Sequence, residues 1–164
     1  MSTAVLLARQ QRLHMLRETL VSMMINASLS ALFVFLIFGG RDRVGLWGMG
    51  GLAFDFVPQT FIIAFMATLV PSLITRRRIR LGKMAGAASG ASKLPGNLVM
   101  RSLMIAALVS IVAIPLAVVA IAFGSSGELN FATVLPMKIL YGATLALLVT
   151  TFAIRAALGD GAGA

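Results

Sequence analysis

Three long blocks without a charged residue constrain this chain more than any other feature. Residues 20–38, 56–75 and 102–123 contain no Asp, Glu, Lys or Arg, and they are 19, 20 and 22 residues long. A helix of about 20 apolar residues crosses the roughly 30 Å hydrocarbon core of a bilayer. The three blocks therefore predict three transmembrane helices.

A fourth block, residues 139–154, is 16 residues long and too short to span a bilayer alone. Extending it back to Phe131 gives 24 residues and brings Lys138 into the span, near one membrane surface. The composition agrees, since 59% of residues are hydrophobic and 12% are charged, whereas soluble domains average about 45–50% and about 25%. We predict an all-α membrane protein with four transmembrane helices.

The basic residues are distributed unevenly between the two predicted sides of the membrane. Counted by connection, one side holds 11 and the other 3 of the 14 Lys and Arg residues. The positive-inside rule then places both termini in the cytoplasm, an N-in, C-in topology. The stretch TRRRIRLGK at 75–83 contributes most to this bias.

The same stretch predicts contact with the membrane surface. Anionic lipid headgroups attract basic side chains near the cytoplasmic leaflet, and we expect such contacts at Arg76, Arg77, Arg78 and Arg80. We expect no nucleic-acid partner, because no aromatic residue between Ile74 and Asn97 offers a surface on which bases stack.

The predicted helices divide the chain into five parts. Residues 1–19 form either an interfacial helix on the cytoplasmic leaflet or a helical start that continues into the first span. Residues 20–81 form a first transmembrane hairpin and 98–158 a second. Between them, 82–97 is rich in Gly, Ala and Ser and predicts a flexible cytoplasmic linker. Residues 159–164 predict a disordered tail.

The two hairpins resemble tandem copies of one another. A shift of 78 residues pairs Pro58 with Pro136, and a shift of 80 pairs Ser22 with Ser102. Because a two-helix unit returns to the same side of the membrane, such repeats are parallel and related by an axis along the membrane normal.

Each predicted span also carries a stripe of small or polar residues at four-residue steps, which place side chains on one helical face. The stripes are Ser22, Asn26 and Ser30; Thr60, Ala64, Thr68 and Ser72; Ser102, Ala106 and Ser110; and Lys138, Gly142, Ala146 and Thr150. Small residues let transmembrane helices approach closely, so one interpretation is a set of packing seams. The alternatives are a polar path through the bundle and lateral docking to another membrane protein.

Charged and titratable residues are few. Asp55 and Lys138 fall at the same predicted depth, so we consider an ion pair at the outer rim beside the alternative that Lys138 snorkels to the surface. No Asp or Glu lies near the middle of a span, which counts against a proton-coupled carrier. His14, the only histidine, is predicted on the surface.

The sequence lacks the residues that common enzyme chemistries need. There is no cysteine, no phosphate-binding glycine loop and no HExxH motif, and only five acidic residues are scattered along the chain. We therefore predict a protein that is not an enzyme and that has no cofactor or metal site.

The stretch FDFVPQTFIIAFMATLVPSLITRRR at 54–78 combines D-F-x-P-Q, an apolar span, a proline and an arginine run. It resembles small bacterial inner-membrane proteins of unknown function that are described as permease-like. The resemblance implies a multi-pass protein of the bacterial inner (plasma) membrane and implies no site residue.

Two functions are consistent with these patterns. The first is a non-enzymatic accessory or structural subunit that packs against other membrane proteins or against itself. The second is a small permease-like transporter acting as a homo-oligomer.

Overall fold

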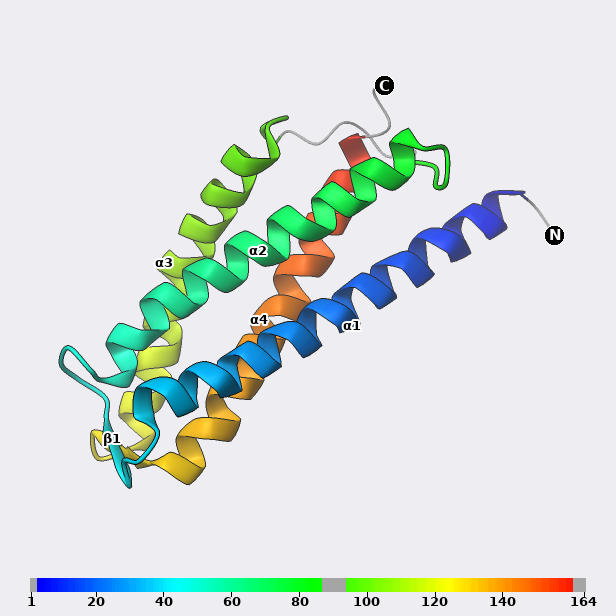
Figure 1. Ribbon diagram of the computed structural model, residues 1–164. Helices are drawn as coiled ribbons and strands as arrows, with labels where there is room; N and C mark the ends of the chain where they lie inside the picture. Colours follow the sequence, from blue (N-terminus) through cyan, green and yellow to red (C-terminus); the bar gives the residue numbers. More distant parts are fainter. Residues whose placement is uncertain (1–2, 87–93, 161–164) are drawn as a thin grey trace.

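Four long helices dominate the computed structural model, which describes residues 3–86 and 94–160. The elements are α1 (Thr3–Phe38), β1 (Arg43–Gly45), α2 (Leu52–Arg80), α3 (Leu98–Gly124), β2 (Glu128–Asn130) and α4 (Phe131–Gly159) (Figure 1). All four helices are long and apolar enough to cross a membrane. The predicted helical fold with four candidate membrane spans is confirmed.

Helix α1 runs without interruption for 36 residues. At 1.5 Å per residue it is about 54 Å long, well beyond the roughly 30 Å of a bilayer core. Its first turns therefore extend past the hydrocarbon when the rest of the helix spans it. For residues 3–19 the structure has the second of the two interpretations, a helical start that continues into the first span.

The helices pack in the row α1–α4–α2–α3 rather than as two separate hairpins. Helix α1 packs along α4, α4 along α2, and α2 along α3, whereas α1 with α2 and α3 with α4 make few contacts (Figure 1). The predicted hairpins are thus connections along the chain and not packing units. The reason lies in α4, whose small residues let α1 and α2 approach it from two sides. At Gly142, an added Cβ would lie 2.2 Å from the Ser30 hydroxyl oxygen.

One end of the bundle is closed by the two strands. Strands β1 and β2 pair antiparallel, with Val44 opposite Leu129. Val44 and Leu46 are fully buried in a core that includes Phe38 and Phe56. Neither strand was predicted from the sequence, because a three-residue strand is too short to show an alternation of polar and apolar residues. We call this end the strand end and the opposite one the terminal end.

The terminal end is more ordered than the linker and tail predictions implied. In the described part of the linker, Met84 is buried against Ile154 and Leu158. Helix α4 continues to Gly159, and Asp160 is held by ion pairs. The disordered tail predicted from residue 159 is therefore corrected at these two positions. Residues 87–93 and 161–164 lie outside the described chain.

The contact at Gly142 generates a first prediction. In Gly142→Ala, the new methyl group displaces the Ser30 hydroxyl and meets the Asn26 backbone oxygen at 3.3 Å. We expect a loss of about 1–3 kcal/mol, typical of an overpacked seam, measured as a lower melting temperature in detergent.

Gly124→Ala is the matched control, because a Cβ at Gly124 meets nothing within 4 Å. Equal melting temperatures for the two variants would contradict a close α1–α4 contact at this position.

Candidate functional site

The predicted stripes lie in the seams of the bundle. Within the described chain, all of these residues are buried except Ser110, which is half-buried: Ser22, Asn26, Ser30, Thr60, Ala64, Thr68, Ser72, Ser102, Ala106, Lys138, Gly142, Ala146 and Thr150. The row of helices brings the stripes of α1, α4 and α2 together, and the stripe of α3 faces α2. The same small and polar residues therefore fill the helix contacts.

Hydroxyl groups in these seams form hydrogen bonds within the protein. Thr150 Oγ1 donates to Ser22 Oγ at 2.8 Å and joins α4 to α1. Thr68 Oγ1 donates to the Ala64 carbonyl oxygen one turn earlier, also at 2.8 Å. Such bonds satisfy polar groups that have no water available within a bilayer.

Near the strand end, Lys138 and Asp55 form an ion pair between α4 and α2. The Lys138 Nζ lies 2.5 Å from Asp55 Oδ2 and 4.0 Å from the centre of the Phe56 ring. The Lys138 side chain is 1% exposed, so the ammonium group does not snorkel to the surface. A buried ammonium group needs a counter-charge, because its transfer from water is costly.

Tyr141 extends this contact by one turn of α4. Its hydroxyl lies 2.6 Å from Thr60 Oγ1, and its ring meets Phe56 edge-on with centroids 4.7 Å apart. Tyr141 was not among the predicted site residues. Its spacing of three residues from Lys138, which places both on one helical face, is the signal that was available.

A groove separates α1 from α2, with α4 behind it. Two adjoining pockets of about 110 and 230 Å³ share Asn26, Leu29 and Ile62 as lining residues. The smaller pocket reaches Asp55 near the strand end, and the larger one reaches Ile74 near the terminal end. We call the two pockets together the α1–α2 groove.

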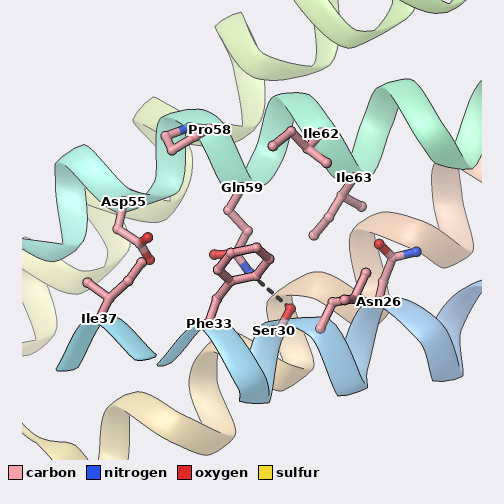
Figure 2. A pocket seen from close by; sticks show the side chains of 10 residues that line it. Asn26, Ser30, Phe33, Ile37, Asp55, Pro58, Gln59, Ile62 and Ile63 are labelled. Carbon is pink, nitrogen blue, oxygen red and sulfur yellow. Dashed lines mark hydrogen bonds between the residues drawn. The ribbon is translucent and has the colours of Figure 1, made fainter. Parts of the chain in front are cut away.

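Polar side chains lie between the apolar walls of this groove. Gln59 Nε2 donates to Ser30 Oγ at 2.9 Å across the groove (Figure 2). The Gln59 amide oxygen is buried and has no hydrogen-bond partner in the described chain. The amide group of Asn26 points from α1 toward α2 (Figure 2) and donates to the Ser22 carbonyl oxygen at 2.8 Å. Gln59 was missed because it lies next to a stripe position rather than on one.

The first turns of α1 dock against the end of α2. His14 is buried, with Nε2 3.1 Å from Thr75 Oγ1 and Nδ1 3.6 Å from Glu18 Oε1. Gln10 donates to the carbonyl oxygen of Lys83 at 2.9 Å. The surface position predicted for His14 is therefore wrong, because the continuous α1 carries this residue across the face of α2.

Two arginines and one aspartate tie α2, α3 and α4 together at the terminal end. Arg101 is fully buried and donates to both carboxylate oxygens of Asp160, at 2.8 and 2.9 Å. Arg76 donates to Asp160 Oδ2 from Nε at 3.0 Å and from Nη2 at 2.8 Å. We call these three residues the Asp160 cluster.

The Asp160 cluster lowers the pKa of its carboxylate and holds the Arg76 guanidinium within the protein. Burial raises the pKa of Asp160, but hydrogen bonds from Arg101 and Arg76 outweigh it and hold that pKa below the ordinary value of 3.8. Arg76 also donates to the Gly96 carbonyl oxygen at 2.8 Å. Its guanidinium is thus engaged within the protein, and the expected contact of Arg76 with lipid headgroups stays a prediction.

The ion pair at the strand end generates a second prediction. In Lys138→Met, Asp55 loses its counter-charge, and we expect a loss of about 3–5 kcal/mol in unfolding free energy. Reversible unfolding in mixed detergent micelles measures this change.

The pair Arg43–Glu128 is the control, because its side chains are 74% and 58% exposed and 3.5 Å apart. Arg43→Gln should cost less than about 1 kcal/mol. Similar losses in both variants would show that burial does not set the strength of the Lys138–Asp55 pair.

The Asp160 cluster generates a third prediction. Because the folded-state pKa of Asp160 is lowered, its contribution is present above pH 3.8 and is lost as pH falls through the folded value. Asp160→Asn should cost about 1.5–3 kcal/mol near neutral pH, because Arg101 and Arg76 lose a charged hydrogen-bond acceptor. Melting temperatures of both proteins should converge as the pH is lowered.

Asp42→Asn is the control, since Asp42 is exposed and outside the cluster. It should change the stability by less than about 0.5 kcal/mol at neutral pH. A gap between wild type and Asp160→Asn that stays constant down to acidic pH would contradict the linkage.

The described residues contain no group of three or more His, Cys, Asp or Glu side chains able to hold a metal ion. Comparison with known proteins finds no matching family model, no matching curated protein and no matching solved structure. A functional proposal therefore rests on the geometry of the seams, the α1–α2 groove, the Lys138–Asp55 ion pair and the Asp160 cluster.

Proposed function

We propose that this chain is a non-enzymatic multi-pass membrane protein that acts as an accessory or structural subunit. It packs laterally against copies of itself or against other membrane proteins. The observation that carries the proposal is the open row of helices, in which α1 and α3 each pack along a single neighbour. Large apolar side chains on these two helices face outward, among them Met24 and Leu36 of α1 and Ile111 and Leu116 of α3.

The filled interior supports a structural role over a passage. Between α2 and α4, Lys138 pairs with Asp55 and Tyr141 bonds Thr60, so these polar groups contact each other directly. A path for a solute requires polar groups that face open space. In this seam the polar side chains contact one another and face no open space.

The proposal includes a bacterial inner-membrane location with both termini in the cytoplasm and two parallel repeats. The uneven distribution of basic residues supports the orientation. The helix contacts support the repeat, because α1 packs on α4 of the other half just as α3 packs on α2. Strands β1 and β2, which occupy equivalent connections, pair with each other around Val44 and Leu129.

A small permease-like transporter that works as a homo-oligomer is the second candidate. The α1–α2 groove favours it, because the Gln59 amide oxygen has no hydrogen-bond partner among the described residues and a second copy would cover the open side of the groove. Flux of a solute into liposomes that contain only this protein would support transport. A broad solute panel without flux would count against it.

Cysteine cross-linking tests the lateral association directly, since the chain contains no cysteine. We introduce single cysteines at outward positions of the terminal helices and oxidise native membranes. At least one of these variants should give a covalent dimer that persists when the membranes are diluted with excess lipid: Met24→Cys, Leu36→Cys, Ile111→Cys and Leu116→Cys.

Ala146→Cys is the control, because Ala146 is fully buried and should give no dimer. Association with a different protein is detected in parallel as a native mass above that of the monomer. Monomers in every variant, together with a monomeric native mass, would overturn the proposed role.

A further inference from the structure

The walls of the α1–α2 groove are two ladders of apolar side chains at four-residue steps. The ladder on α1 is Val21, Ile25, Leu29, Phe33 and Ile37, and the ladder on α2 is Ile62, Met66, Val70 and Ile74. One turn beyond each ladder, toward the terminal end, lies an arginine. Arg17 precedes Val21 on α1, and Arg78 follows Ile74 on α2.

The two arginines lie at the same end of the groove, which we call its mouth. His14 Nε2 lies 3.1 Å from Thr75 Oγ1, and these two residues come three positions before Arg17 on α1 and three positions before Arg78 on α2. Glu18 also lines the groove here, 3.6 Å from His14. The two arginines outnumber this single carboxylate.

Neither arginine is neutralised by an ion pair within the described chain. Arg17 is exposed and Arg78 is half-buried. They differ in this respect from Arg76 and Arg101, which share Asp160. The mouth of the groove therefore presents positive charge to an anion from outside.

The larger pocket of the groove, next to the terminal end, has the length of one bilayer leaflet. Its α2 wall from Ile62 to Ile74 rises about 18 Å, at 1.5 Å per residue. One leaflet contributes about 15 Å of hydrocarbon, half of the roughly 30 Å core. An acyl chain is narrow enough to lie between the ladders.

We propose that the α1–α2 groove binds one anionic phospholipid from the leaflet at the terminal end. Its phosphate lies between Arg17 and Arg78, and one acyl chain lies between the two apolar ladders. This inference does not depend on the proposed subunit role, because the groove lies within a single chain.

Native mass spectrometry of the full chain tests the proposal. The protein is titrated with phosphatidylglycerol, and with phosphatidylcholine of the same acyl chains. We expect one phosphatidylglycerol retained per chain and preferred over phosphatidylcholine. Removing both charges in Arg17→Gln/Arg78→Gln should weaken phosphatidylglycerol binding about thirtyfold.

Arg77→Gln/Arg80→Gln is the matched control for charge. It removes two exposed arginines of α2 that do not continue either ladder, and it should weaken binding by no more than about threefold. Equal effects of the two double variants would overturn the site and leave only general attraction to an anionic surface.

A second pair of variants tests the acyl-chain position. Val21→Trp fills the groove without changing charge and should abolish retention of the lipid. Met24→Trp adds the same ring at a residue that is 70% exposed and outside the groove, and it should retain the lipid. Retention by both variants, or a polypeptide rather than a lipid bound in the groove, would overturn the proposal. The arginine variants alter only the surface, so they decide the question even if Val21→Trp does not fold.

Discussion

The close approach of α1 to α4 at Gly142 holds the row of helices together. In a bilayer the hydrophobic effect does not drive helices against each other, so small residues and hydrogen bonds must do so. Gly142 provides the space for Ser30, and the Ser30 hydroxyl in turn accepts a hydrogen bond from Gln59 on α2. Because Gly142 has no side chain, α1 can lie close to α4, and this position of α1 places one wall of the α1–α2 groove.

Ion pairs link helices at both ends of the bundle. They involve Lys138, Arg76 and Arg101, so these basic residues already have a carboxylate partner. At the strand end, Lys138 and Asp55 neutralise each other between α4 and α2. At the terminal end, Asp160 engages Arg76 and Arg101 and so joins three helices. Arg17 and Arg78, which form no ion pair among the described residues, lie at the mouth of the groove, where we propose that a lipid headgroup binds.

Much of the candidate site was accessible from the sequence, but its pairings were not. Packing seams were one interpretation of the stripes at four-residue steps, and an ion pair was one of two alternatives for Asp55 and Lys138. Arg101 was only one of the 14 basic residues counted by connection, because nothing local distinguishes a buried arginine from an exposed one. Its partner Asp160 lies 59 residues away, in a segment whose composition predicts disorder.

The sequence by itself determined the class of the protein, because uncharged blocks of about 20 residues have few alternatives to spanning a membrane. It also determined which face of each helix is small or polar. Only the tertiary structure decided that α1 packs on α4 and α3 on α2, since similar stripes on four helices fit several pairings. It also decided where the groove lies, because a space between α1 and α2 exists only when α4 holds both helices apart.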